Sequence, residues 1–370
     1  MSTLFTPMLL DALTLANRII VAPMCQYSAE AGEANDWHLM HLGQLAMSGA
    51  GLLLSEAVAV TPEGRISPHD LGLYSDKTEQ ALGRVIRAIR LYSAMPLGLQ
   101  LAHAGRKAST ARPWDGGHHL PPEHGGWTIL APSPVPYQDS DPCPQALDSA
   151  GLQRLLQAFA DAAARAARLG VDMLELHAAH GYLLHQFLSP LANFRTDAYG
   201  GSLENRMRFP LQVFEAVRAT FPPGKPVGVR ISATDWVEGG WDVAQSTVFS
   251  QELKRLGCAY IHASSAGLSP RQQIPVTPGY QVGFAAQIRA ACHLPTIAVG
   301  LITEAEQAET IVASGQADMV ALARAMLYDP RWPWHAAAAL GAHVDAPPQY
   351  WRSQPHAYKT LFNEPPVPQG

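Results

Sequence analysis

The sequence predicts an α/β protein folded as a (β/α)8 TIM barrel, and three observations support this prediction. Eight short apolar runs rich in β-branched residues alternate with longer stretches of helical periodicity, which is the pattern of strand and helix units around a parallel sheet. Several runs are apolar almost throughout, as strands covered on both faces must be. Polar and reactive residues follow the same end of run after run, which packing alone does not explain.

The eight predicted strands are spread over most of the chain. They are residues 18–22, 51–57, 96–102, 171–177, 226–232, 258–264, 295–300 and 318–323. Between them, LQRLLQAFADAAARAARLG has helical spacing and ends at Gly170, a residue type that suits a helix C-terminus. A doubly wound dinucleotide fold would need a GxGxxG turn after a strand. The chain offers only SGAGLLL at 48–54, where the glycines precede the strand.

We expect one barrel domain over residues 1–345, with two additions. The stretch 103–148, rich in Pro, Gly and His, is too long for an ordinary strand-to-helix connection and is expected to cap the barrel after its third strand. Its histidines, His118, His119 and His124, are interpreted as solvated loop residues. Residues 346–370 are rich in proline and are predicted to form an extended C-terminal arm.

Composition narrows the class of protein. The 370 residues are 47% apolar and 15% charged, with a formal net charge of -5, which suits a compact enzyme with a small-molecule substrate rather than a nucleic-acid or membrane partner. No signal peptide or bilayer-spanning stretch is visible, so we expect a cytoplasmic location. The four cysteines, Cys25, Cys143, Cys258 and Cys292, form no CxxC pair, which argues against a zinc site, an iron–sulfur cluster or a disulfide framework.

The strand ends carry the candidate chemistry, because active sites of such barrels lie there. LELHAAHGY places His177 and His180 three residues apart, with Tyr182 two further on. An HxxH pair can be a metal site, so one alternative is a metal-dependent hydrolase with His177, His180 and either Glu175 or His185 as ligands. No second ligand cluster appears at the other strand ends.

Other polar motifs are interpreted as structural. His38 and His41 in WHLMH repeat the HxxH spacing and are assigned to structure. In YGGSLENR, Ser202 is predicted to be a helix N-cap after a glycine turn. Arg206 and Arg208 are predicted to anchor loops or form salt bridges.

Four motifs in register resemble those of the old yellow enzymes, which are FMN-dependent ene-reductases. The motifs are APMCQY at 22–27, LQLAHAGRKAS at 99–109, HAAHGYLLHQFLSP at 177–190 and NFRTDAYGGSLENRMRF at 193–209. The similarity runs from about Leu4 to Arg352, and the cysteine and HxxH pair resemble the bacterial, thermophilic-like branch that includes xenobiotic reductases. It implies tightly bound, non-covalent FMN and NAD(P)H as reductant, with NADPH the expected form. Activated alkenes such as α,β-unsaturated carbonyls would be the acceptors, with nitro compounds and quinones as further ones.

The resemblance also implies ten cofactor-binding residues, because the flavin needs donors at its edges and a seat for its phosphate. Ala22, Pro23, Met24 and Cys25 would line the N5 edge of the ring, Ala57 and Gln100 its other edge, Arg230 the N1 and O2 atoms, and Gly300, Ala323 and Arg324 the phosphate. Relatives often have glycine before that arginine, and Ala323 departs from this pattern while keeping its backbone amide donor.

For the substrate, the resemblance implies that His177 and His180 each donate a hydrogen bond to one carbonyl or nitro oxygen, where negative charge develops. Tyr182 would protonate the α carbon as a general acid, and Tyr27 would add a hydroxyl. Cys25 would touch the flavin edge and the substrate and tune the redox potential. Hydride would pass from NAD(P)H to N5 and then to the alkene at one shared site, which predicts ping-pong kinetics.

Relatives of this branch form dimers in which a C-terminal arginine reaches the other subunit's site. PPQYWR resembles that arm, so Arg352 and Trp351 are predicted to contact substrate, and a homodimer or dimer of dimers is expected. A flavin-binding protein without turnover is a further alternative, while iron–sulfur dienoyl-CoA reductases would need a cysteine cluster. The physiological substrate, the roles of Arg106 and Lys107 and the tail after Arg352 stay open.

Overall fold

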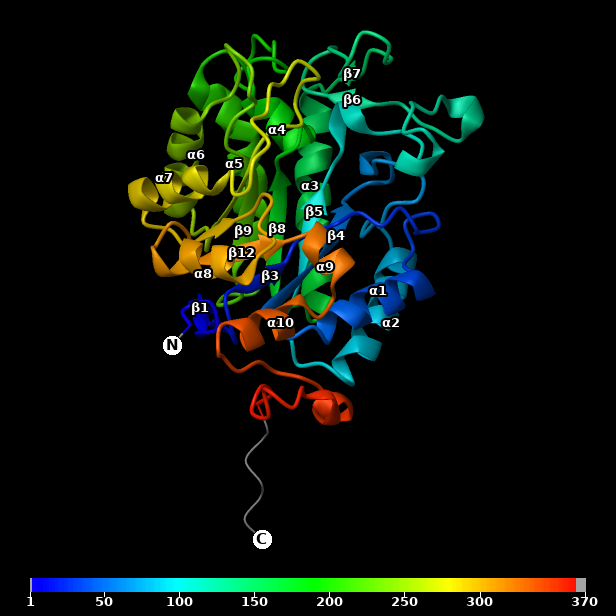
Figure 1. Ribbon diagram of the computed structural model, residues 1–370. Coiled ribbons are helices and arrows are strands. Elements are labelled where there is room, and N and C mark those ends of the chain that lie inside the picture. Colours follow the sequence, from blue (N-terminus) through cyan, green and yellow to red (C-terminus); the bar gives the residue numbers. More distant parts are fainter. Residues whose placement is uncertain (1, 364–370) are drawn as a thin grey trace.

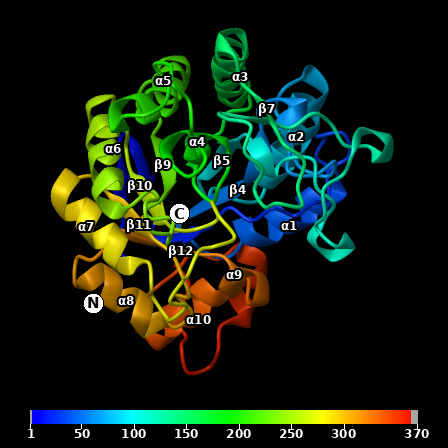
Figure 2. The ribbon, with the colours of Figure 1, turned by 90° about the horizontal axis from the view of Figure 1, so that it is seen from above.

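Eight parallel strands close into a barrel surrounded by helices in the computed structural model, which describes residues 2–363 (Figures 1 and 2). The strands are β3 (Ile19–Val21), β4 (Leu52–Ala59), β5 (Leu97–Ala102), β8 (Met173–Ala178), β9 (Val227–Ser232), β10 (Ile261–Ser264), β11 (Thr296–Ala298) and β12 (Met319–Leu322). Each pairs with the next barrel strand in the chain, and β12 returns to β3. The predicted (β/α)8 TIM barrel is confirmed, and each predicted run overlaps its strand.

The helices follow the strands and cover the outside of the barrel (Figure 2). They are α1 (Asp36–Ala46), α2 (Asp76–Arg90), α3 (Ser149–Arg168), α4 (Leu183–Leu188), α5 (Leu203–Thr220), α6 (Val243–Arg255), α7 (Val282–Cys292), α8 (Ala305–Ala313), α9 (Arg324–Tyr328) and α10 (Trp332–Ala339). As predicted, Ser202 caps α5 by accepting a hydrogen bond from the amide of Asn205. α3 is capped at its start by Asp148 and is followed by Gly170 at φ 73°, as its sequence predicts.

A short hairpin closes the N-terminal end of the barrel, and the sequence did not predict it. Its strands, β1 (Met8–Leu10) and β2 (Leu13–Leu15), have three residues each, too few to show a periodic pattern. Leu10 and Leu15 are buried in one cluster with Met173, Tyr260 and Met319 from the barrel interior. The hairpin thus completes the core at the end opposite the strand termini that carry the polar motifs.

The segment 103–148 lies at the upper end of the barrel in Figure 1 and contains short elements. These are β6 (Leu130–Ala131), β7 (Gln145–Ala146) and three 3-10 turns, η2 (Gly105–Lys107), η3 (Pro113–Asp115) and η4 (Pro122–His124). The guanidinium of Arg195 donates to the carbonyls of Pro132 and Leu147 at 2.9 and 2.6 Å. The NFRTDAYGG motif therefore fastens this capping segment to the barrel.

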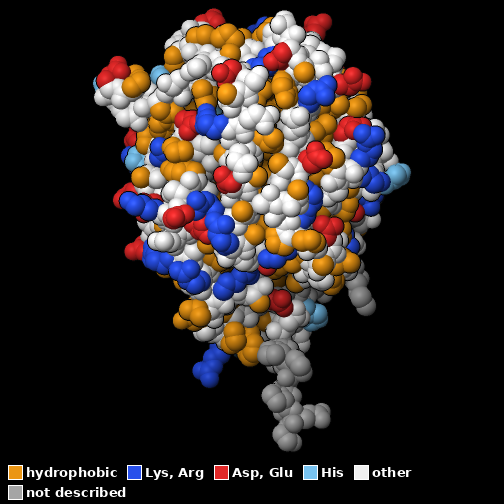
Figure 3. Space-filling model, turned by 180° about the vertical axis from the view of Figure 1, so that it is seen from behind, with side chains coloured by type: hydrophobic (Ala, Val, Ile, Leu, Met, Phe, Trp, Pro, Cys, Tyr) orange, Lys and Arg blue, Asp and Glu red, His pale blue; other side chains and the backbone are white. Residues whose placement is uncertain are grey.

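The chain after α10 lies at the lower end of Figure 1, away from the capping segment, and contains η5 (Pro348–Ser353). Residues 364–370 of the predicted arm lie outside the described residues. Positive and negative side chains are interspersed on the face in Figure 3. Among the described residues, no helix combines the length and apolar character needed to cross a bilayer. The cytoplasmic location stays a prediction.

Candidate active site

The residues predicted to border the flavin come from adjacent strands. Ala22 is buried directly after β3, where its amide donates to the carbonyl of Leu322 at 3.0 Å, and Pro23 and Met24 continue from it. A shift in register within β4 brings Ala57 opposite Gln100 of β5, and both are buried. The structure therefore brings the two predicted edges together at one end of the barrel.

Arg230 has the properties of a ligand-binding cation. It lies on β9 between His177 of β8 and His262 of β10 in the strand register, and only 7% of it is exposed. Its Nε is buried without a hydrogen-bond partner among residues 2–363. A buried unpaired cationic donor is costly unless a ligand satisfies it, so this residue fits the electron-rich edge of a flavin.

The predicted phosphate residues also meet at the ends of paired strands. β11 and β12 pair side by side, Gly300 follows the first and Ala323 and Arg324 follow the second. Gly300 has φ 121°, and a Cβ there would lie 2.6 Å from the side chain of Gln281, so this position requires glycine. Arg324 is exposed and can offer its guanidinium to a phosphate.

The two histidines of HAAHGY face each other at the end of β8. His177 Nε2 lies 3.3 Å from His180 Nδ1, and the rings meet edge to face. His177 Nδ1 accepts a hydrogen bond from the amide of Ala179 at 3.2 Å, so a neutral His177 carries its proton on Nε2. His180 Nε2 lies 2.8 Å from Ser264 Oγ. With no acceptor at the site, His177 Nε2–H donates to His180 Nδ1 and His180 Nε2–H donates to Ser264 Oγ. When the serine hydroxyl donates to Nε2 instead, the proton of His180 is on Nδ1, and both rings can donate to one ligand oxygen.

Both rings are held in the neutral form. Burial first, and then the positive charge of Arg230, lowers the pKa of His177 and of His180 well below the ordinary value. Two neutral imidazoles 3.3 Å apart can share one acceptor oxygen without placing two positive charges side by side. This is the arrangement that a polarised carbonyl oxygen needs.

Tyr182 completes the cluster with its ring 4.8 Å from that of His177 and perpendicular to it. Burial raises its pKa well above the ordinary value, so the phenol keeps its proton. Tyr27 and Tyr182 line a cavity of about 440 Å³ that is walled by the capping segment. Tyr27 has φ 50° and packs edge to face on Trp114 of η3.

Cys25 follows Met24 in the chain and is within electrostatic range of the buried carboxyls of Asp70 and Glu56. It is partly exposed, yet its pKa is raised well above the ordinary value because desolvation, Asp70 and Glu56 all disfavour the thiolate. A protonated thiol is a poor nucleophile, in keeping with the predicted contact role.

Arg106 and Lys107 donate hydrogen bonds to backbone carbonyls around the site. Arg106 donates to the carbonyls of Val135, Pro136 and Leu268. Lys107 Nζ donates to the carbonyls of His180 and Gly267 at 2.9 and 3.0 Å. Both residues therefore brace the capping segment and the turn that carries His180.

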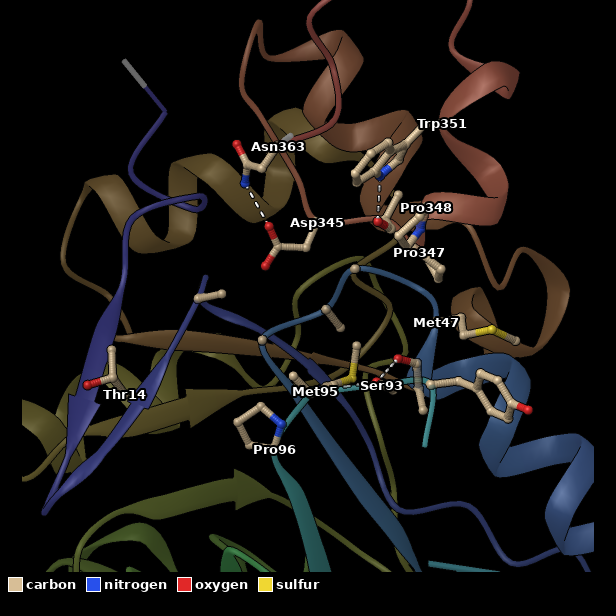
Figure 4. A pocket seen from close by; sticks show the side chains of 18 residues that line it. Thr14, Met47, Ser93, Met95, Pro96, Asp345, Pro347, Pro348, Trp351 and Asn363 are labelled. Carbon is tan, nitrogen blue, oxygen red and sulfur yellow. Dashed lines mark hydrogen bonds between the residues drawn. The ribbon is translucent and has the colours of Figure 1, made fainter. Parts of the chain in front are cut away.

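Trp351 and Arg352 do not join this cluster within one chain. Trp351 lies in η5, donates to the carbonyl of Ala346 at 3.0 Å and lines a cavity with Met95 and Pro96 (Figure 4). These two residues precede β5, so the cavity is at the opposite end of the barrel from His177. Arg352 is exposed, and a role for either residue requires a second subunit.

The alternative metal site has other partners for its supposed ligands. Glu175 accepts hydrogen bonds from three side chains inside the barrel. His185 Nε2 lies 2.8 Å from Asp235 Oδ1, and its Nδ1 accepts from the amide of Gly181. Within residues 2–363, no three His, Cys, Asp or Glu side chains are grouped so that they could hold a metal ion. His38 lies in the first turn of α1, where its Nδ1 accepts a hydrogen bond from the backbone amide of the N-cap residue Asn35 and its Nε2 lies 3.4 Å from Glu56, in keeping with the predicted structural role.

Several residues at the site were not found from the sequence. Ser232 accepts from the amide of His180, and Ser264 contacts its ring. Gln281 joins Ser265 to the carbonyl of Val299. Asp70 is buried and accepts from the amides of Ile66 and Ser67. Ser232 and Ser264 are single serines at the ends of β9 and β10, and Asp70 is a single aspartate in a loop. No spacing sets them apart from other strand-end or turn residues, so no sequence signal was available.

Comparisons with known proteins agree with this geometry. A family model described as the NADH:flavin oxidoreductase / NADH oxidase family matches residues 3–342. The NADPH dehydrogenase of Geobacillus thermodenitrificans is 42% identical over 353 residues, covering 95% of this chain and 98% of its own. That of Bacillus subtilis is 39% identical over 351 residues, covering 94% and 98%. The solved structure of morphinone reductase superposes with a TM-score of 0.77 at 30% identity, covering 99% of this chain and 94% of that chain.

The barrel and its site define a flavin-dependent NAD(P)H oxidoreductase. The chain belongs to the NADH:flavin oxidoreductase / NADH oxidase family, the family of the old yellow enzymes. Membership implies FMN and NAD(P)H as its cofactors. The buried Nε of Arg230, which has no hydrogen-bond partner in the described part of the chain, fits the first of them. The hydrolase and the non-catalytic flavin carrier are thereby set aside.

Proposed function

We propose that this enzyme reduces activated alkenes, above all α,β-unsaturated carbonyl compounds, at the expense of NADPH. The observation that carries the proposal is the approach of His177 Nε2 and His180 Nδ1 to 3.3 Å beside the ring of Tyr182. Two N–H donors with a phenol next to them suit a substrate that carries an oxygen acceptor and a carbon that must be protonated. Nitro compounds offer the same acceptor oxygen.

FMN would be held without a covalent bond by Gln100, Arg230 and Arg324, together with the backbone of 22–25, Ala57, Gly300 and Ala323. When bound, it would supply hydride transfer from NADPH to the β carbon of the alkene. The protein's part is to orient and to protonate. His177 and His180 hold the carbonyl oxygen, Tyr27 contributes a hydroxyl, and Tyr182, whose burial raises its pKa, retains the proton that the α carbon takes. The name NADPH dehydrogenase, which two of the relatives carry, supports NADPH rather than NADH as the reductant proposed for this chain.

The test is an absorption spectrum of the purified protein, followed without oxygen by NADPH and then by 2-cyclohexenone. Yellow bands that bleach with NADPH and return with the enone would support FMN, both half-reactions and one shared site. A colourless protein that cannot be reconstituted with FMN would overturn the proposal. NADH in place of NADPH, at equal concentration, measures the coenzyme preference.

The roles of the histidines are tested by replacing His177 and His180 with alanine, singly and together. Enone and phenol binding should weaken and alkene reduction should slow by about 10²-fold or more for each lost donor, with the yellow colour retained. His41→Ala is the matched control, because His41 belongs to an equally spaced pair and stacks on Trp37 on α1. Loss of FMN in the site variants alone would refute the assignment of these rings to the substrate.

We also propose a homodimer or dimer of dimers, in which Trp351 and Arg352 complete the site of the other subunit. Large apolar side chains are exposed at Met40 (63%) on α1, at Leu91 (76%) and Tyr92 (70%) directly after α2, and at Tyr328 (94%) at the end of α9. Such side chains are candidates for burial between subunits. Sedimentation measures the assembly.

Mixing two inactive variants tests the shared site. After subunit exchange, a mixed dimer contains one Arg352→Ala subunit and one Tyr182→Phe subunit. The site of the first subunit then has its own Tyr182 and receives Arg352 from the second. Recovered activity is expected on mixing, and no recovery despite proven subunit exchange would contradict the reach of Arg352 between subunits.

A further inference from the structure

A layer of polar side chains fills the barrel interior between Gln100 and Arg230. At its centre is Glu175 of β8, which is completely buried. Its carboxylate accepts hydrogen bonds from Gln100 Nε2 at 2.7 Å, from the hydroxyl of Tyr260 at 3.2 Å and from His262 Nδ1 at 2.9 Å. The other end of the barrel interior is filled by apolar side chains. Packing alone therefore does not explain a buried carboxylate with three donors.

The sequence builds this layer from four neighbouring barrel strands, β5, β8, β9 and β10. Glu175 and His177 are two residues apart on β8, so both point inward. Gln100 pairs with Glu175 across β5 and β8. Tyr260 has room for its ring because β9 carries Gly228, where a Cβ would lie 2.2 Å from the ring. Gly228 pairs with Glu175 across β8 and β9, so the absence of a side chain there lets the hydroxyl of Tyr260 reach the carboxylate.

The layer holds one negative and one positive charge. Burial raises the pKa of Glu175, but His262, Arg230 and Gln100 more than offset this and leave its pKa below the ordinary value. Burial lowers the pKa of His262 in spite of Glu175, so His262 is a neutral donor through Nδ1. Arg230 is the cation. Burial lowers its pKa, and the negative charge of Glu175 raises it again in part.

The contact with Gln100 also fixes the orientation of its amide. Because Nε2 donates to the carboxylate, Oε1 must point away from it. A flipped amide would set two acceptor oxygens at about hydrogen-bond distance, which is repulsive. Gln100 is therefore presented to a ligand with its acceptor side fixed.

We propose that Glu175 is the positioning residue that sets the redox balance of the flavin site. It fixes the amide of Gln100 and offsets the charge of Arg230, and so holds the reduction potential of bound FMN lower than Arg230 alone would leave it. The role rests on the proposed FMN site. Its physical basis is that reduction adds negative charge to the ring, which a buried carboxylate in this layer opposes.

The experiment measures the reduction potential of FMN bound to the full-length protein, against a reference dye. Glu175→Gln removes the charge and keeps the shape. The reduction potential should rise by at least about 30 mV. For a two-electron couple, this corresponds to a tenfold gain in the affinity of reduced FMN relative to oxidised FMN. Asp235→Asn is the control, because Asp235 is also fully buried and paired with a histidine but lies outside the layer. It should leave the potential within about 9 mV, a twofold change.

Tyr260→Phe gives a second measurement that does not depend on the folding of the first variant. It keeps the charge of Glu175 and removes one hydrogen bond that disperses it, so the potential should fall. An unchanged potential in Tyr260→Phe, or a shift in Glu175→Gln no larger than in Asp235→Asn, would overturn the proposal. Wild-type protein that takes up no FMN would instead overturn the proposed function, so the two failures are distinguishable.

Discussion

The ionisation of Asp70 should make the stability of this protein depend on pH, and replacing Asp70 should remove that contribution. Asp70 is buried beside Ile66 and Ser67, and it lines a small cavity with Ala57 and Tyr182. Burial raises the pKa of its carboxyl from 3.8 to about 7, although hydrogen bonds from Ser67 and the amide of Ile66 oppose the rise. Asp70→Asn keeps the shape and removes the ionisation.

The sign follows from the two pKa values. Below 3.8 the carboxyl is protonated in the folded and the unfolded chain. As pH rises, the unfolded chain loses the proton first, while the folded chain keeps it until about pH 7. Over this window, each pH unit costs the native state about 1.4 kcal/mol through this group. Between about pH 5 and about pH 8 the total loss is about 3 kcal/mol.

The assay is reversible urea unfolding of wild type and Asp70→Asn, both saturated with FMN, at several pH values. The difference in free energy of unfolding between Asp70→Asn and wild type should move in favour of the variant by about 3 kcal/mol between about pH 5 and about pH 8. Glu63→Gln, which changes a surface carboxyl paired with Arg154, is a control for general charge effects. A stability difference between wild type and Asp70→Asn that does not change with pH would refute the reasoning.

The remaining predictions concern the site. Tyr182→Phe should slow alkene reduction by 10²- to 10⁴-fold, the usual contribution of a general acid, and should affect flavin reduction by NADPH far less; equal slowing in stopped-flow experiments would exclude the proton-donor role. Ser264→Ala removes the contact that sets the proton position of His180 and should weaken phenol binding about fivefold, or ~1 kcal/mol, in an absorbance titration. Lys107 loses its proton at about pH 8, because burial and Arg106 lower its pKa; enone turnover should therefore decline above that pH, and Lys107→Met should be slower and lack this step. A wild-type profile flat to pH 10 would contradict it.

The fold could be predicted because the information for it is local. Each barrel strand is a short apolar run whose neighbours in space are its neighbours in sequence, and the repeated alternation with helices defines the barrel. The hairpin of β1 and β2 lacked such a signal, since its strands have three residues each. Its burial depends on Tyr260 and Met319, residues far along the chain.

At the site, too, the residues that lie close together in the sequence could be predicted, and the contacts between distant residues could not. His177, His180 and Tyr182 could be predicted because one strand end carries all three within six residues. The anchoring of His180 by Lys107 joins residues 73 positions apart, and the contact of Glu175 with His262 joins residues 87 apart. In the sequence, Glu175 was a possible metal ligand, because nothing there shows that three donors on other strands already occupy it.

These contacts suggest why the two histidines can be neutral in a site that also holds cations. Arg230 and Lys107 lie near the rings and lower their pKa values, so protonating either imidazole would add a positive charge beside two existing ones. Glu175 offsets Arg230 from below without contacting His177 or His180. The carboxylate therefore reduces the net charge of the layer while leaving the rings without an anionic partner that would favour the imidazolium. A carboxylate placed next to His180 instead would favour a charged, permanently paired ring, and the donor pair that the carbonyl oxygen requires would be lost.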